Sequence, residues 1–254
     1  MSELFDLTGK TALVTGGGRG IGRAIATELA AAGAAVVPSA RSTDEIEAVA
    51  DEIDAAGGDA LAVPADVTDP DAVTNAIDRT EDTFGSVDIV VNNAGFNPDS
   101  ALGQPEDVST DDLERVLAVN LSGAYEVTRA AADGLEDTGG SVINVASVGG
   151  LVGLPRQHPY VASKHGLVGL TKSLSLDWAP EVRVNAVAPG YVSTDLTEDL
   201  EGNERLRQSI LERTPLERFA EPEEIAGPVV FLASDAASYV TGSVLAADGG
   251  WTAR

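Results

Sequence analysis

Short apolar runs alternate with longer amphipathic segments along most of this chain. The run Thr11–Thr15 ends in a glycine cluster, and residues 21–32 then repeat apolar side chains at helical spacing before Gly33. This order predicts a strand, a tight loop and a helix. The same alternation predicts further strands at 35–38, 60–64, 87–91, 141–145, 182–187 and 244–246, and further helices at 43–56, 69–84, 111–135, 160–178, 203–212 and 222–232.

Several of the predicted strands, such as 89–91 and 142–143, are continuous apolar runs. Such runs are typical of a parallel sheet whose two faces are both covered by helices. The repeated units share no fixed period, which argues against a solenoid. The sequence therefore predicts an α/β fold with a single Rossmann-like, doubly wound parallel sheet of about seven strands flanked by helices on both faces. Residues 1–254 are expected to form one domain, and the polar loop at 192–203 is expected to include a mobile lid.

Composition narrows the classes of function. The chain has no cysteine and only two histidines, His158 and His165, so neither disulfides nor a metal site is expected. No segment approaches the roughly 20 apolar residues that span a bilayer, and the acidic start lacks the features of a secretory signal. We expect a cytoplasmic protein that does not enter membranes.

Charge is strongly unbalanced, with 16 basic and 41 acidic residues and a formal net charge of -25. This charge would repel nucleic acids and anionic membranes. Acidic residues occur in every predicted helix, whereas the only lysines are Lys10, Lys164 and Lys172. We interpret this pattern as a surface adapted to high salt, where a Debye length of about 3 Å at 1 M screens the repulsion. An ordinary acidic cytosolic protein and a docking surface for a basic partner are the alternatives.

A glycine cluster, residues 15–22 (TGGGRGIG), stands where the first predicted strand gives way to the first helix. Backbone amides at that helix start can face a pyrophosphate, and glycine permits the tight turn and close approach. A turn that serves packing alone is the alternative. The spacing of Gly16, Gly20 and Gly22 differs from the commonest dinucleotide fingerprint and resembles that of the short-chain dehydrogenase/reductase family.

The resemblance extends over nearly the whole chain. Motifs like those of the family follow in order: Asp66-Val67, Asn92-Asn93-Ala94-Gly95, Asn120, Ser147, Tyr160-Val161-Ala162-Ser163-Lys164, Pro189-Gly190-Tyr191-Val192-Ser193-Thr194 and Asp248-Gly249-Gly250. The resemblance implies hydride transfer between a nicotinamide cofactor and a carbonyl or hydroxyl. It also implies that Asn120, Ser147, Tyr160 and Lys164 are the catalytic group.

Elementary chemistry supports part of this assignment. Tyr160 and Lys164 are four residues apart, so on a helix they project from one face. A nearby ammonium favours the phenolate, and Tyr160 would exchange a proton with the substrate while Ser147 holds the substrate oxygen. The resemblance adds that Lys164 binds the nicotinamide ribose and that Asn120 holds a water chain leading to Lys164. Asn120 could instead be a satisfied polar group inside a helix.

Cofactor contacts are also implied by the resemblance. Asp66 and Val67 would contact adenine, although Asp66 could equally cap the next helix. The remaining positions are Gly16, Arg19, Gly20, Ile21, Gly22, Arg41, Asn93, Ala94, Gly95, Tyr160, Lys164, Pro189, Gly190, Val192 and Thr194.

Cofactor choice depends on the end of the second predicted strand, where an acidic side chain would accept bonds from a free ribose 2′-hydroxyl. Ala40 stands at that position, followed by Arg41, and Arg19 is available for a 2′-phosphate. NADP is therefore favoured over NAD. Arg41 could instead stack on adenine and accept either cofactor, and high salt would weaken exposed phosphate contacts, so dual use is also expected.

Substrate identity is the least determined feature. The two ends of the chain resemble the branch that oxidises sugars and sugar acids, such as gluconate or 2-deoxy-D-gluconate dehydrogenases. A 3-oxoacyl-thioester reductase is the alternative, and a catalytically silent dinucleotide sensor is a third reading. His158 either binds substrate or caps the catalytic helix, and Arg156 either meets an anionic substrate or lies on the surface. The family likeness implies a homotetramer acting on a small molecule. The expected pocket residues are Val148, Leu151, Val152, Leu154, Arg156, Gln157, His158 and Tyr191.

Overall fold

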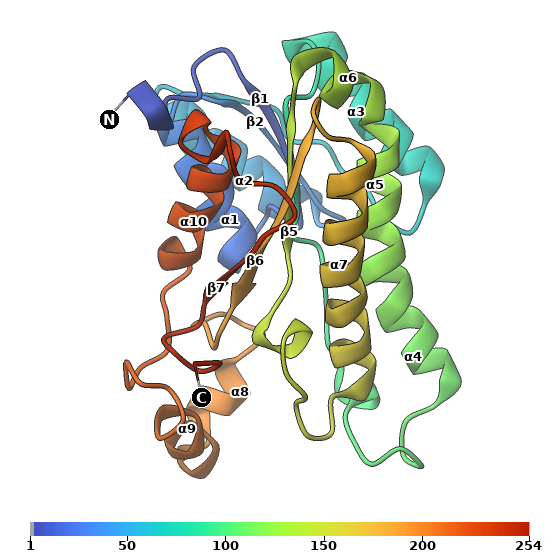
Figure 1. Ribbon diagram of the computed structural model, residues 1–254, viewed down its shortest axis with the longest axis vertical. Helices are drawn as coiled ribbons and strands as arrows, with labels where there is room; N and C mark the ends of the chain where they lie inside the picture. The colour runs from blue at the N-terminus through green and yellow to red at the C-terminus, as the bar shows by residue number, and fades with distance from the viewer. Residues whose placement is uncertain (1–2, 254) are drawn as a thin grey trace.

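The computed structural model describes residues 3–253, and in it seven parallel strands form one sheet (Figure 1). Their order across the sheet is β3-β2-β1-β4-β5-β6-β7, so the winding reverses between β1 and β4. In open α/β sheets, ligands bind outside the carboxyl ends of the strands at such a reversal. The strands are β1 Thr11–Thr15, β2 Ala35–Ser39, β3 Asp59–Ala60, β4 Ile89–Asn92, β5 Ser141–Val145, β6 Arg183–Pro189 and β7 Val244–Ala247.

Helices cover both faces of this sheet. Figure 1 shows α1, α2 and α10 on one side and α3, α5 and α7 on the other. The helices are α1 Gly20–Ala31, α2 Thr43–Ala55, α3 Pro70–Phe84, α4 Thr110–Leu117, α5 Ala124–Ala130, α6 Ala132–Thr138, α7 His158–Asp177, α8 Glu198–Gly202, α9 Glu204–Leu211 and α10 Glu223–Ala233. Short 3-10 turns lie at Glu3–Phe5, Asp99–Ala101, Val148–Gly150 and Asp235–Ala237, and one π-helical turn, η3, spans Ala118–Gly123.

The hydrophobic core has two layers because consecutive strand residues point to opposite faces. In β1, Val14 belongs to the same buried cluster as Ile25 of α1, whereas Leu13 belongs to the cluster of Ile77 in α3. Both faces of the central strands are therefore dry, which explains their continuous apolar sequences. The fold class predicted from the sequence is confirmed.

The strand predicted at 60–64 is much shorter than expected. Leu61 and Val63 still donate backbone hydrogen bonds to the carbonyl oxygens of Val36 and Pro38, at 3.1 and 3.2 Å. Pro38 has no N–H with which to return a bond, so the regular ladder stops at Ala60.

The single helix predicted at 111–135 is also wrong in detail. α4 ends at Leu117, the π turn η3 follows, and α5 and α6 are separated at Ala131, where φ is -88° and ψ is 5°. The spacing of apolar residues does not reveal a single wider turn inside a helix, because the helical period is the same on either side of it. The loop expected at 192–203 contains the short helix α8. Within residues 3–253, every helix is too short or too polar to cross a membrane.

Candidate active site

A cavity of about 730 Å³ opens at the carboxyl ends of the strands. Its walls come from the loops after β1 to β6 and from the start of α7. All of the cofactor positions expected from the sequence line it: Gly16, Arg19, Gly20, Ile21, Gly22, Arg41, Asp66, Val67, Asn93, Ala94, Gly95, Tyr160, Lys164, Pro189, Gly190, Val192 and Thr194. Ser147 lines it too, whereas Asn120 lies behind its wall.

The glycine loop forms a cradle that larger residues would fill. Gly16 and Gly20 have φ angles of +62° and +50°, which favour glycine. A Cβ on Gly22 would lie only 2.0 Å from the Gly16 carbonyl oxygen. Arg19, the N-cap residue of α1, makes no side-chain capping bond. The loop and the first turn of α1 therefore fit the pyrophosphate of a dinucleotide.

Asn93 fixes this loop against β4. Its Nδ2 donates to the carbonyl oxygens of Thr15 and Gly16, at 3.0 and 3.1 Å. The Thr15 hydroxyl in turn accepts from the backbone N–H groups of Asn93 and Ala94. Asn93 thus holds the cradle in shape through its side chain, whereas the sequence predicted only a contact between Asn93 and the cofactor.

Ser147, Tyr160 and Lys164 meet at the deep end of the cleft. Ser147 lies two residues after the end of β5, and its Oγ accepts a hydrogen bond from the Gly149 N–H at 3.0 Å. Lys164 Nζ donates to the carbonyl oxygen of Val145 at 2.7 Å and lies 5.7 Å from the centroid of the Tyr160 ring. Only 4% of Lys164 is exposed, so this ammonium is almost fully desolvated.

Burial shifts both titratable groups toward their neutral forms. It raises the pKa of the Tyr160 phenol, while the nearby Ser147 hydroxyl opposes that shift and Tyr191 adds to it. It lowers the pKa of Lys164 to about 8. Tyr160 in this state is a proton donor, and Lys164 can release its proton near neutral pH.

Asn120 is held inside the π turn and is 1% exposed. Its Oδ1 accepts from the Phe96 N–H at 2.9 Å, and its Nδ2 donates to the Phe96 carbonyl oxygen at 3.0 Å and to Ser163 Oγ at 3.2 Å. The side chain therefore ties the loop after β4 to α7. A Cβ on Gly95 would lie 3.3 Å from Asn120 Oδ1 and 3.6 Å from Lys164 Nζ, so the Gly95 backbone lies close to both.

Asp66 does not cap α3. That role belongs to Asp69, whose side chain accepts from the Asp71 N–H at 3.0 Å. Asp66 instead accepts from the Thr68 N–H and hydroxyl, at 2.9 and 2.7 Å, and lies 3.9 Å from an Arg41 nitrogen. The Thr68 backbone bond, its hydroxyl and Arg41 keep the pKa of this carboxyl below its usual value, against the effect of burial.

The part of the cleft where the substrate is expected contains a pair of amide side chains, Asn97 and Gln157. The sequence predicted Gln157 as a pocket residue but not Asn97. Asn97 Nδ2 donates to Gln157 Oε1 at 3.0 Å, and the buried Asn97 Oδ1 has no hydrogen-bond partner. Of the expected pocket residues, Val148, Leu154, Gln157 and Tyr191 line the cleft, whereas Leu151, Val152, Arg156 and His158 do not. The unexpected lining residues in this half are Phe96, Asn97, Asp99, Leu102, Leu196, Asp199 and Leu200.

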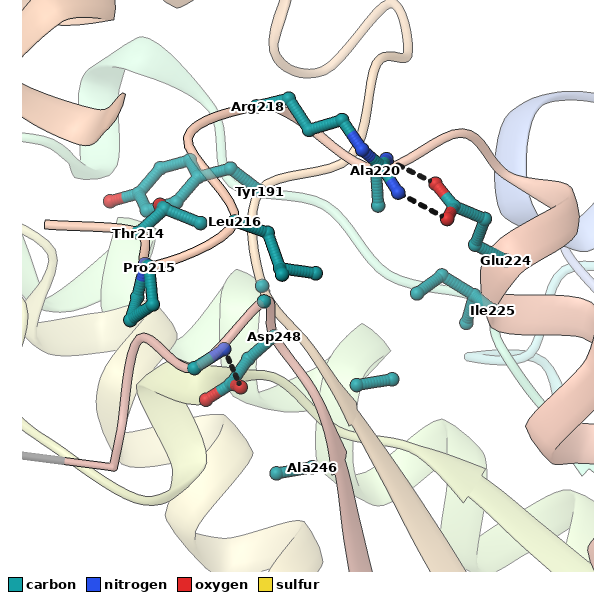
Figure 2. Close-up of a pocket in the computed structure, with 14 residues that line it drawn as sticks. Tyr191, Thr214, Pro215, Leu216, Arg218, Ala220, Glu224, Ile225, Ala246 and Asp248 are labelled. Atoms are coloured by element: carbon teal, nitrogen blue, oxygen red, sulfur yellow. Dashed lines mark hydrogen bonds and ion pairs between the residues drawn. The ribbon is translucent and has the colours of Figure 1, made fainter. Parts of the chain in front are cut away.

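A second, smaller cavity of about 460 Å³ adjoins the cleft at Gly190 and Tyr191 (Figure 2). Arg218 in its wall pairs with both carboxylate oxygens of Glu224, at 2.5 and 2.6 Å. The Asp248 carboxylate accepts from the Gly250 N–H at 2.9 Å. The charged groups of this wall are thus already paired within the chain.

Known proteins share this architecture. The family described as enoyl-(acyl carrier protein) reductase matches residues 16–252. A 3-oxoacyl-[acyl-carrier-protein] reductase of Synechocystis sp. is 43% identical over 248 residues, which cover 96% of this chain and 97% of that protein.

Solved structures are also similar over nearly the whole chain. A protein of Beutenbergia cavernae, provisionally named an NAD(P) dependent gluconate 5-dehydrogenase and holding NADP at low occupancy, is 45% identical with a TM-score of 0.93, covering 99% of this chain and 100% of that one. A gluconate 5-dehydrogenase of Burkholderia cenocepacia, in complex with NADP and tartrate, is 36% identical with a TM-score of 0.94, covering 99% and 98%.

These similarities span the sheet, the glycine cradle and the helix α7 rather than one motif. The sequence resemblance drawn from ordered short motifs is therefore confirmed over the whole matched region. The chain belongs to the short-chain dehydrogenase/reductase family.

Proposed function

We propose that this protein is an NAD(P)-dependent oxidoreductase that interconverts a secondary alcohol and a carbonyl. The observation that carries the proposal is the meeting of Ser147, Tyr160 and the desolvated Lys164 at the end of a glycine-cradled cleft. A bound nicotinamide would supply or accept the hydride. NADP is the favoured cofactor, because Arg19 and Arg41 line the adenosine end of the cleft, and NAD is the alternative.

The chain's own residues account for the proton and for orientation. Ser147 Oγ hydrogen-bonds the substrate oxygen and holds it beside the Tyr160 phenol. In reduction, Tyr160 donates its proton to that oxygen; in oxidation, Tyr160 accepts the proton of the alcohol. The Lys164 ammonium stabilises the phenolate that remains. Asn120 acts through the Phe96 backbone and Ser163, which makes it a positioning residue.

For the substrate we propose a sugar or sugar acid. The Asn97 and Gln157 side chains both line this half of the cleft, and amide groups can donate hydrogen bonds to substrate hydroxyl groups and accept them. The carboxylates of Asp99 and Asp199, which line the same half, can accept hydrogen bonds from further substrate hydroxyl groups. The gluconate dehydrogenases among the solved relatives agree with this choice.

A 3-oxoacyl-thioester reductase is the second candidate. The curated relative from Synechocystis carries that activity in its name, and Phe96, Leu102 and Leu154 would suit an acyl chain. The net charge of -25 disfavours it where the thioester carrier is itself an acidic protein.

We further propose a cytoplasmic homotetramer. Leu176 on α7 and Tyr239 are 82% and 103% exposed, and β7 forms an open edge of the sheet with Leu245 38% exposed. The cavity in Figure 2 opens beside that edge. Association would cover these apolar groups and the unpaired strand edge. Light scattering in molar KCl gives the mass directly, and a monomer would refute the assembly.

The test of the proposed function is a rate panel in molar KCl. NAD and NADP are supplied separately with aldoses, aldonates and 3-hydroxyacyl thioesters, and the reductions are run in parallel. Turnover of a sugar or sugar acid supports the first candidate, and preference for acetoacetyl thioester with NADPH supports the second. A panel in which the protein turns over nothing, yet binds a dinucleotide, would favour a sensor.

A further inference from the structure

The adenosine end of the cleft carries more negative than positive side chains. Arg19 and Arg41 line it, together with Glu45, Asp66 and Asp195. A 2′-phosphate in this region would therefore meet two arginines and three carboxylates. The sign of the net field on that phosphate depends on where the carboxylates are held.

Two of these carboxylates already engage Arg19. An Arg19 guanidinium nitrogen lies 3.3 Å from Asp195 Oδ2 and 3.9 Å from Glu45 Oε1. Asp195 belongs to the segment after β6, whereas Glu45 lies in the first turn of α2. Arg19 is thus shared between the two acids across the mouth of the glycine loop.

Glu45 is the more firmly positioned of the two. A Cβ on Gly18 would lie 2.8 Å from Glu45 Cβ and 3.2 Å from its Oε2, so the side chain packs directly on the glycine loop. Its side chain is 40% exposed, against 74% for Asp195. Moving Glu45 away from a ligand would require this contact with the glycine loop to open.

The Glu45 carboxylate has two effects on a bound 2′-phosphate: it pairs with Arg19, and it repels the phosphate. The exposed Arg19 pairs are individually weak, so a phosphate can recruit the guanidinium from them. The negative charge of Glu45 stays beside the phosphate after that exchange, and the surrounding protein with its net charge of -25 adds to the repulsion. Concentrated salt reduces this repulsion over a Debye length of a few ångström.

We propose that Glu45 is a specificity-determining residue that lowers the affinity for a 2′-phosphorylated cofactor at low salt and releases this restraint as salt rises. The proposal rests on the proposed use of a dinucleotide in this cleft. It makes the preference for NADP over NAD a function of ionic strength. It also reverses the expectation from the sequence that salt only weakens the phosphate contacts.

Redox-inactive fragments isolate the 2′-phosphate. Calorimetric titrations of the full-length protein would compare 2′,5′-ADP with 5′-AMP, in dilute buffer and in molar KCl. In the unaltered protein, the ratio of the two affinities should shift toward 2′,5′-ADP as salt increases. Glu45→Gln should strengthen 2′,5′-ADP binding about three- to tenfold in dilute buffer, leave 5′-AMP binding nearly unchanged and flatten the salt dependence.

Glu47→Gln is the matched control, because it removes the same charge from the same helix. Glu47 is exposed and does not line the cleft. The effect of Glu47→Gln should stay within about twofold. The proposal is overturned if Glu45→Gln and Glu47→Gln act alike, or if salt lowers the relative affinity for 2′,5′-ADP. Failure of both fragments and of NADPH and NADH to bind would refute dinucleotide use itself, a separate result.

Discussion

Tyr160 and Lys164 show how burial prepares a proton donor and a charge partner at the same place. Desolvation raises the pKa of Tyr160 and lowers that of Lys164 to about 8. Both groups are therefore closer to neutral than they would be in water, and the phenolate forms only where positive charge is close.

Tyr160→Phe removes the proton donor and keeps the ring. We expect turnover to fall about a thousandfold, because positioned general acid–base catalysis contributes on this scale. NADPH affinity should change by less than about twofold, since the phenyl ring still occupies the place of the Tyr160 ring in the cleft wall. Initial rates and fluorescence titration measure the two quantities. A variant that keeps a tenth of the rate would exclude Tyr160 as the donor.

Because burial lowers the pKa of Lys164, we expect the free energy of unfolding of the ligand-free protein to depend on pH. The folded pKa of Lys164, about 8, lies below the ordinary value of 10.5, so between these values the unfolded chain holds a proton that the folded chain has lost. The contribution of Lys164 to stability therefore rises with pH in this window. Relative to Lys164→Met, the unaltered protein should gain about 2 kcal/mol between about pH 7 and about pH 9.5.

Denaturant titrations at the two pH values measure this difference. Lys172→Met, exposed on the same helix, is the control and should show no comparable change with pH. Parallel curves for the unaltered protein and Lys164→Met would show that Lys164 is not desolvated as described.

Residues with a spacing signal were predicted from the sequence, and residues paired through space were not. Tyr160 and Lys164 are one helical turn apart, so their spacing alone places them on one face. Asn97 and Gln157 are 60 residues apart in the chain, and Glu45 meets Arg19 only because α2 packs on the glycine loop. No local pattern reports such contacts.

Single elements show the same limit. The strands β1 and β5 have the bounds that their apolar runs predict, since a run between turn residues is a local property. The π turn at Ala118–Gly123 was not predicted, although it determines where the Asn120 amide lies. Gly123, the last residue of this turn, packs so closely on Val67 that a Cβ would lie 2.6 Å from a Val67 methyl carbon. That contact depends on the tertiary fold.

The first helix and its loop carry a strict steric prediction. Gly22→Ala would place a Cβ 2.0 Å from the Gly16 carbonyl oxygen and 2.5 Å from Asn93 Nδ2. The cradle must open to admit it, so we expect a loss of about 2 kcal/mol of stability and of most dinucleotide affinity. Thermal unfolding and NADPH titration measure both effects.

Gly169→Ala in α7 is the matched control, because no other atom of residues 3–253, apart from those of the adjoining helix backbone, lies within 4 Å of the added Cβ. In a helix interior this change should leave stability equal or raise it by up to about 1 kcal/mol. If Gly22→Ala behaved like Gly169→Ala, close packing would not be the reason for glycine at position 22.

The whole molecule is dominated by its net charge of -25. Its ion pairs lie at or near the surface, as with Arg23 and Glu52, whose side chains are 54% and 45% exposed. Such pairs contribute little individually, and within residues 3–253 most carboxylates have no basic partner, because the acids outnumber the bases so strongly. Repulsion among them therefore opposes the compact state unless salt screens it.

Thermal stability should consequently rise with salt, most steeply where the Debye length falls from about 30 Å at 0.01 M to about 10 Å at 0.1 M. A relief of about 2 kcal/mol would raise Tm by about 4 to 8 °C in a protein of this size. Neutralising the exposed acids Glu47, Asp51, Asp78 and Asp82 on α2 and α3 should raise Tm in dilute buffer and reduce its dependence on salt. Calorimetric melts of both proteins test this, and a Tm independent of salt would mean that the acidic surface does not destabilise the fold.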